Sequence, residues 1–138
     1  MITSILLAYD GSDSAAKAFE MALEIAGKFQ ARLSVLTIAR PPEPAGDVEL
    51  EAVLENAQAH FAAVIEGLKV RTAAAGLRAR FEIRVGHPAE QIVSMAEAER
   101  ADLVIIGHRG KSLFQRWITG STSKQVVSYS PCPVLVVR

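Results

Sequence analysis

Features that direct a protein out of the cytoplasm are absent from this sequence. It has one cysteine, Cys132, so no disulfide can form within the chain, which fits a reducing compartment. No apolar run approaches the ~20 residues that a membrane-spanning helix needs. The opening residues, MITSILLAYDGSDS, lack the basic region of a signal peptide and turn polar at Asp10, which favours a buried strand. We therefore expect a cytoplasmic protein that makes no membrane contact.

An excess of charge of either sign is also absent. Fifteen lysines and arginines balance fifteen aspartates and glutamates, so the formal net charge is zero. This balance predicts no broad electrostatic surface for nucleic acid or an anionic membrane. Half of the residues are hydrophobic and 22% are charged, which is typical of a globular protein. The length of 138 residues predicts one domain, residues 1–138.

Two familiar nucleotide-binding motifs are incomplete. The fragment Gly110-Lys111-Ser112 resembles the end of a P-loop, but that motif requires a glycine where this chain has Ile105. The run Asp10-Gly11-Ser12-Asp13 does not supply the Gly-x-Gly-x-x-Gly of a dinucleotide-binding unit. Nor do we find a catalytic base aimed at a water, or the lysine and magnesium-binding hydroxyl of a P-loop ATPase. The sequence therefore identifies no catalytic residue and no metal ligands.

What the sequence does contain is a regular alternation of strand-like and helix-like segments. Apolar runs at 5–8, 33–38, 103–106 and 133–138 predict four strands. Residues 79–85 alternate apolar and charged, which predicts a fifth strand with one solvated face, near an edge of the sheet. Helices are expected after a cap at Ser12 or Asp13, from near Val48 to a stop at Gly76, from Pro88, and from Gly120. We expect the first helix to bury Ala18, Ala22, Ile25 and Phe29. This alternation predicts an α/β fold with an open parallel sheet and helices on both faces.

Polar and glycine residues follow several of the predicted strands. Asp10 follows the first strand, Arg40 ends the second, and Gly107 follows the fourth. In an open parallel sheet the carboxyl ends of the strands share one edge, where ligands bind at the point of reversed strand order. Turns at Gly107 and Gly110 expose backbone N–H groups, and a helix beginning at Gly120 adds its free amides and positive dipole end. We therefore predict an anion-binding site at this edge.

The spacing Gly-x2-Gly-x9-Gly-Ser over residues 107–121 resembles the ATP-binding signature of the universal stress protein family. The Tyr-Asp-Gly-Ser run at 9–12, the Ala-Asp-Leu-Val-Ile-Ile-Gly run at 101–107 and the Pro-Cys-Pro-Val-Leu-Val-Val ending extend the likeness over nearly the whole chain. The resemblance implies a five-stranded sheet in the order 3-2-1-4-5, of the adenine nucleotide alpha hydrolase-like type. It also implies a regulatory or stress-response protein that binds ATP, with or without Mg²⁺, and forms a homodimer through the last strand, 133–138.

The same resemblance assigns the nucleotide contacts. Asp10 would bind the ribose, and the region of Ala8 and Ile38 would hold the adenine. The whole set comprises Ala8, Tyr9, Asp10, Ile38, Gly107, His108, Arg109, Gly110, Gly120, Ser121, Thr122 and Ser123, of which the residues from Gly107 onward would surround the phosphates. His108 departs from the small residue common in the family, and its imidazole would either donate to a phosphate or crowd the site.

Alternative interpretations stay open at this point. Asp10 is also a common helix cap, and Ser121 and Thr122 suit a helix N-terminus without any ligand. Arg109 and Lys111 are as well explained as solvated loop charges. At the level of function, the alternatives are a slow ATPase or other nucleotide-handling enzyme, and an interaction module whose cleft stays empty. The protein partner and the process served are left open.

Overall fold

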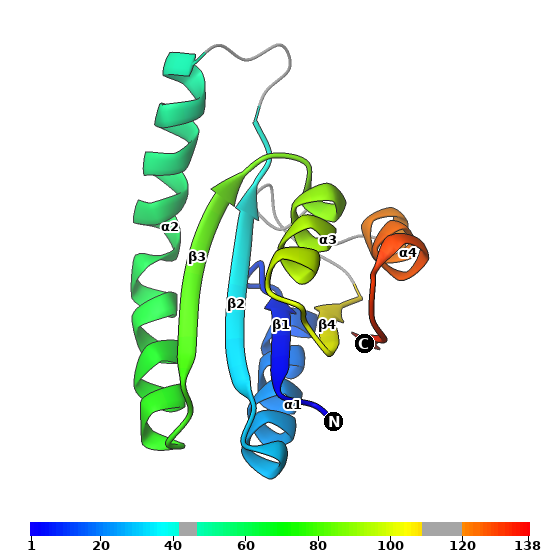
Figure 1. The fold of residues 1–138 in the computed structure, drawn as a ribbon. Helices are drawn as coiled ribbons and strands as arrows, with labels where there is room; N and C mark the ends of the chain where they lie inside the picture. Colours follow the sequence, from blue (N-terminus) through cyan, green and yellow to red (C-terminus); the bar gives the residue numbers. More distant parts are fainter. Residues whose placement is uncertain (42–46, 109–119) are drawn as a thin grey trace.

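The computed structural model describes residues 1–41, 47–108 and 120–138. Five strands and four helices alternate along these residues (Figure 1). The strands are β1 (Ser4–Ala8), β2 (Arg32–Ala39), β3 (Ala79–Val85), β4 (Leu103–Gly107) and β5 (Val134–Val137). The helices are α1 (Asp13–Phe29), α2 (Asp47–Ala74), α3 (Pro88–Ala98) and α4 (Gly120–Tyr129). The predicted alternation of elements is confirmed.

One parallel sheet carries all five strands in the order β3-β2-β1-β4-β5, as the resemblance implied. β1 lies at the centre, where Leu7 registers with Val35 of β2 and with Ile105 of β4. The alternating sequence of 79–85 predicted a strand near an edge with one solvated face, and β3 is indeed an edge strand. β5 forms the opposite edge.

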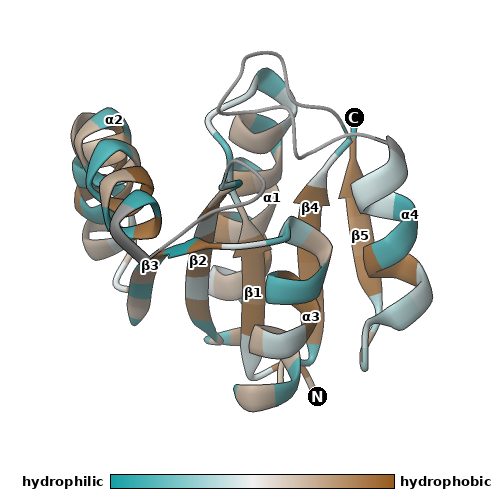
Figure 2. Cartoon of the chain, turned by 90° about the horizontal axis from the view of Figure 1, so that it is seen from above, coloured by the Kyte–Doolittle hydropathy of each residue, from teal (hydrophilic) through white to brown (hydrophobic). Residues whose placement is uncertain are grey.

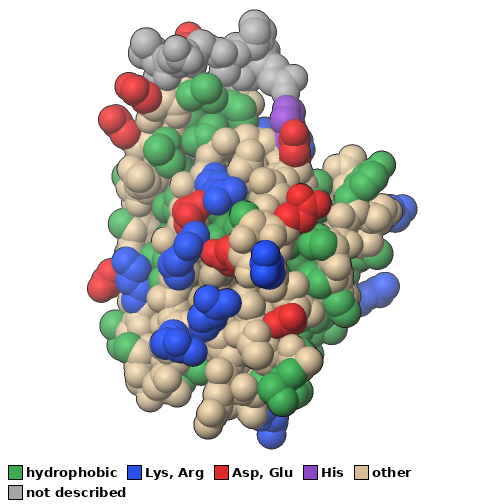
Figure 3. Space-filling model, viewed as in Figure 1, with side chains coloured by type: hydrophobic (Ala, Val, Ile, Leu, Met, Phe, Trp, Pro, Cys, Tyr) green, Lys and Arg blue, Asp and Glu red, His purple; other side chains and the backbone are tan. Residues whose placement is uncertain are grey.

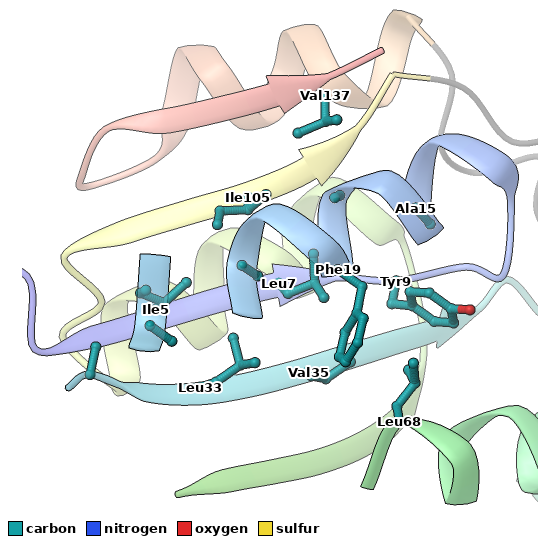
Figure 4. Packing of buried hydrophobic residues seen from close by; sticks show 14 residues of the cluster. Ile5, Leu7, Tyr9, Ala15, Phe19, Leu33, Val35, Leu68, Ile105 and Val137 are labelled. Atoms are coloured by element: carbon teal, nitrogen blue, oxygen red, sulfur yellow. The ribbon is translucent and has the colours of Figure 1, made fainter. Parts of the chain in front are cut away.

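The helices cover both faces of the sheet (Figure 2). α1 and α2 lie on one face, and α1 builds the larger core there with Phe19 packed beside Leu7 and Val35 (Figure 4). α3 and α4 lie on the other face, where Ile92 and Val126 pack against Leu6 and Ile106. β1 is therefore buried on both faces of the sheet, which accounts for its uninterrupted apolar sequence.

The buried stripe of α1 differs from the prediction in its second half. The fully buried side chains are Ala15, Ala18, Phe19, Ala22 and Ala26, whereas Ile25 is only partly buried and Phe29 is 50% exposed. Both sets fit a helical period, so the pattern alone did not separate them. Small alanine side chains allow the helix to approach the sheet closely, and this close approach decides which stripe faces inward.

Helix ends follow local chemistry. Ser12 is the N-cap of α1, and its hydroxyl accepts a hydrogen bond from the Ala15 N–H at 3.1 Å. α2 ends at Ala74, and Gly76 adopts a φ of 72°, a left-handed conformation that glycine reaches without strain. The predicted cap and the predicted stop are both confirmed.

Candidate functional site

The strand order reverses between β1 and β4 (Figure 1). From β1 the chain crosses to β2 over the face covered by α1, and β4 is reached from β3 over the face covered by α3. Ala8 and Ile106 are the last registered pair of these two strands, so Asp10 and His108 each follow two residues later at the same edge. The topology therefore brings together the two segments that the sequence placed at one site, although about a hundred residues of chain separate them.

Asp10 is the most unusual side chain at this edge. It is 0% exposed, and its Oδ1 accepts a hydrogen bond from the Ser12 N–H at 2.9 Å. Its Oδ2 is buried and has no hydrogen-bond partner among the described residues. Burial raises the pKa of Asp10 from 3.8 to about 6, while hydrogen bonds from Ser12 act in the opposite direction. A buried carboxylate oxygen without a donor is costly, and such a group at the carboxyl edge of a parallel sheet calls for a donor from outside the described residues.

The turn after β1 holds this carboxylate in place. The Asp10–Ser12 hydrogen bond closes a short turn, and Gly11 within it has a φ of 82°. Because Ser12 caps α1, the alternative in which Asp10 itself is the cap is wrong. Asp10 instead supports the turn with one oxygen, and its other oxygen has no partner in the described part of the chain. The Gly after Asp10 was the sequence signal for this tight turn.

A buried hydroxyl ties the end of β1 to β2. The Thr37 Oγ1 donates to the carbonyl of Tyr9 at 2.8 Å, and the Tyr9 N–H donates to the carbonyl of Leu36 at 2.9 Å. Both backbone groups of Tyr9 are thereby occupied, and its ring lies in the core beside Phe19 (Figure 4). Burial and the neighbouring Asp10 raise the pKa of Tyr9. Thr37 was missed by the sequence reasoning, since a threonine within a strand carries no distinctive signal.

Ala8 and Ile38 lie beside this turn with both side chains fully buried. They belong to the core under α3 rather than to an open surface. Arg40, at the end of β2, is exposed, and His87 is the N-cap residue of α3. The two side chains predicted to hold the adenine thus lie within the hydrophobic core, below the carboxyl edge of the sheet.

Gly107 is required by packing. A Cβ at this position would lie 2.7 Å from the Ser14 Oγ and 2.9 Å from the Ala15 backbone nitrogen. The first turn of α1 therefore rests directly on the end of β4, which a side chain would prevent. From the sequence we predicted that this glycine lets a ligand approach the backbone. In the structure it lets the first turn of α1 approach the end of β4.

Two segments were predicted to bind phosphate, the turn after β4 and the start of α4, and the structure describes only part of them. His108 extends the sheet, because its N–H donates to the carbonyl of Val137 at 2.7 Å. Gly120 begins α4, Ser121 is exposed, and Thr122 and Ser123 are buried. The Ser123 Oγ is buried without a partner among the described residues. The predictions for Arg109, Gly110 and Lys111 fall outside the described residues.

Cys132 has a structural explanation. The Ser130 hydroxyl donates to the Cys132 carbonyl at 2.8 Å and accepts from the Cys132 N–H at 3.2 Å. This small turn leads from α4 into β5.

In the part of the chain that the structure describes, no helix combines the length and the apolar character needed to cross a membrane.

The sheet order and the polar groups at its reversal point define an α/β protein of the kind that binds ligands at the carboxyl edge. The model of the universal stress protein family matches residues 1–138. A universal stress protein of Thermus aquaticus is 38% identical over 147 residues, and the match covers all of both chains. This chain therefore belongs to the universal stress protein family.

Solved structures agree with this assignment. The universal stress protein UspA from Lactobacillus plantarum has a TM-score of 0.78 and 29% identity, and the match covers 99% of this chain and 97% of that one. A universal stress protein in complex with cAMP has a TM-score of 0.74 and 26% identity, again covering 99% of this chain and 97% of the other. The fold is the adenine nucleotide alpha hydrolase-like fold that these structures share.

Proposed function

We propose that this chain binds an adenine nucleotide, specifically ATP with or without Mg²⁺, at the carboxyl edge between β1 and β4. The observation that carries the proposal is the Oδ2 of the buried Asp10, which lies at the point of strand reversal and has no partner within residues 1–41, 47–108 and 120–138. A ribose hydroxyl would supply the missing donor. The solved relative in complex with cAMP supports an adenine nucleotide as the ligand class.

The phosphates would lie toward α4 under this proposal. Free N–H groups at the start of α4 and the positive end of its dipole favour an anion beside Gly120 and Ser121. The Ser123 Oγ, buried without a partner among the described residues, would add a hydroxyl donor. Arg109 and Gly110 complete the proposed set from the sequence signature.

The biological role that follows is regulatory. We propose a cytoplasmic stress-response protein that retains its nucleotide and acts as a homodimer through β5 (Val134–Val137). β5 is an edge strand with an apolar sequence, and such an edge is suited to pairing with a second chain. For this role the chain supplies N–H groups that would bind phosphate and the Asp10 carboxylate, which would accept a hydrogen bond from the ribose. It lacks the lysine of a P-loop.

Mass spectrometry of freshly purified, denatured protein is the direct test. Co-released ATP supports retention, whereas a protein that releases no nucleotide is an interaction module instead. Calorimetric titration then compares the wild type with Gly120→Val. We expect the variant to lose ATP binding while its circular dichroism is unchanged, because a branched side chain would occupy the phosphate space.

The matched control is Gly67→Val, at a helical position with no atom within 4 Å of the added Cβ. Equal ATP affinity in Gly120→Val and the wild type would contradict the placement of the phosphates. ATP turnover well above the uncatalysed rate, lost in Asp10→Ala, would favour the enzyme alternative over retention.

A further inference from the structure

A second polar depression lies at the opposite end of the sheet, far along the strands from the proposed nucleotide site. It is a groove of about 730 Å³ at the amino ends of β1, β2 and β3, beside the last turn of α3. Its volume falls within the range of small-molecule sites in proteins. Figure 3 shows lysine and arginine side chains gathered over this part of β2 and β3, with acidic side chains between them.

The groove exists because α3 is too short to cover its face of the sheet. α3 has 11 residues and is ~17 Å long, whereas the eight residues of β2 extend over ~26 Å. The upper residues of this face, Leu36 and Ile38, are apolar and lie under α3. Below them the same face carries Arg32 and Ser34, so the side chains become polar where the helix ends.

Two buried serines form the floor of the groove. Ser4 is 4% exposed and Ser34 is 8% exposed, and both belong to the groove lining. Ser4 registers with Arg32, and Ser34 registers with Arg80, so each serine has an arginine as its partner on the neighbouring strand. Hydroxyl donors within a basic wall are suited to an oxyanion.

An ion-pair network positions one of the arginines. Arg80 contacts the carboxylate of Glu82 at 2.9 Å and that of Glu99 at 3.1 Å, and Arg84 also pairs with Glu82. These four charges cancel. The second carboxylate oxygen of Glu99 is buried without a partner among the described residues. Glu99 lies at the α3 end of the groove, so it holds Arg80 toward the space that the helix leaves open.

Arg32 and Arg78 supply the charge that remains. Both line the groove, and neither forms an ion pair within residues 1–41, 47–108 and 120–138. The nearby Asp102 carboxylate accepts hydrogen bonds from the N–H groups of Thr3 and Ser4 at 2.8 and 3.0 Å and does not belong to the groove lining. The lining thus has two guanidinium groups without an ion-pair partner among the described residues, beside hydroxyl donors, and this set suits a phosphate monoester, which carries a charge of roughly −2 near neutral pH.

We propose that this groove is a second ligand site, which binds a small phosphate monoester through Arg32, Arg78 and the Ser4 and Ser34 hydroxyls. The apolar part of its wall, Leu77 and Ala98, would contact the organic portion of the ester. The site is separate from the carboxyl edge, so it does not depend on nucleotide binding there.

The test is an NMR titration of the ¹⁵N-labelled full chain with glycerol 2-phosphate, in the presence of saturating ATP. We expect the amide signals of Ser4, Ser34 and Arg80 to shift and saturate. The variant Arg32→Gln/Arg78→Gln should bind at least about tenfold more weakly, which is the loss of one charge-assisted hydrogen bond. Both arginines are exposed, so the exchange should leave the fold intact.

The matched control is Lys17→Gln/Lys28→Gln, which removes the same charge from the exposed face of α1 and should leave the affinity within about twofold. Acetate at the same concentration should shift these signals less. Equal shifts with acetate would overturn the choice of a phosphate dianion. Shifts confined to the carboxyl edge, or an equal loss of affinity in both double variants, would overturn the site itself.

Discussion

Asp10 combines a structural and a functional demand in one side chain. One oxygen holds the turn after β1, and the other is buried without a donor in the described chain. Its pKa of about 6 lies above the 3.8 of an exposed aspartate, because burial disfavours the charged form. At neutral pH the folded protein therefore carries a carboxylate whose ionisation costs stability.

The sign of the resulting pH dependence follows from this raised pKa. Between pH 3.8 and about 6 the folded state binds more protons at Asp10 than the unfolded state does. The contribution of Asp10 to the free energy of unfolding is therefore fully present below pH 3.8 and is lost as the pH rises through 6. Above that pH, the charged side chain destabilises the nucleotide-free protein.

Asp10→Asn should therefore stabilise the nucleotide-free protein at pH 7.5 by about 1–3 kcal/mol. The amide oxygen keeps the hydrogen bond from Ser12, and the buried charge is removed. Urea unfolding of both proteins at pH 7.5 and at pH 3.5 measures this difference, which should shrink at the lower pH. A variant that is less stable at pH 7.5, or equally shifted at both pH values, would contradict the role of the buried charge.

Among the secondary-structure elements, the close packing of α1 on the end of β4 depends on the absence of a side chain at Gly107. The first turn of α1 contacts Gly107 at the place where a Cβ would lie, and the nearest atoms include backbone of Ser14 and Ala15. A helix backbone cannot give way as a flexible side chain can. The distance between α1 and the switch point is therefore set by this glycine.

Gly107→Ala should destabilise the protein by about 1–3 kcal/mol, because α1 must move away from the sheet. Gly67→Ala is the control: the added Cβ meets no atom within 4 Å, and alanine is the better helix former by up to about 1 kcal/mol. Thermal unfolding of both variants should show shifts of opposite sign. An unchanged thermal stability of Gly107→Ala would contradict the close contact between α1 and the end of β4.

At the scale of the whole molecule, β5 leaves one edge of the sheet unpaired within the described chain. The carbonyl of Pro133 accepts a hydrogen bond from Val104 of β4, and that of Val137 accepts one from His108, which follows β4. Since alternate residues of a parallel strand bond to the same neighbour, the N–H of Val136 points to the outer edge. The side chains of Val134 and Val136 meanwhile pack against the core under α3 and α4. Lysines at these positions would disturb that core as well as the edge.

Val136→Pro tests the pairing of the outer edge separately from the packing of the core. Proline removes the outward N–H without breaking the bonds to β4, and edge strands tolerate it. We expect the proposed dimer to dissociate at micromolar concentration in sedimentation velocity, with the monomer still folded. Val136→Ala keeps the N–H and should remain dimeric. A Val136→Pro protein that stays dimeric would place the interface elsewhere.

The alternation of five strands and four helices could be predicted from the amino-acid sequence, because apolar runs and helical periods depend on neighbouring residues along the chain. It also indicated Asp10 and the glycine signature, since each lies next to a predicted strand or helix end. The strand order needed the family resemblance. The prediction for the buried side chains of α1 was wrong at Phe29, which is exposed, whereas Ile25 is partly buried against the core, because a helical period fits more than one set of inward residues.

Which polar groups lack a partner among the described residues became clear only from the folded chain. Three features each depend on segments brought together by the sheet: the Asp10 oxygen without a partner in the described chain, the hydrogen bond from Thr37 to Tyr9, and the contact of α1 with Gly107. The groove at the amino end depends on the length of α3 relative to the strands beneath it. Burial and pairing arise from contacts between distant parts of the chain, so no local pattern encodes them.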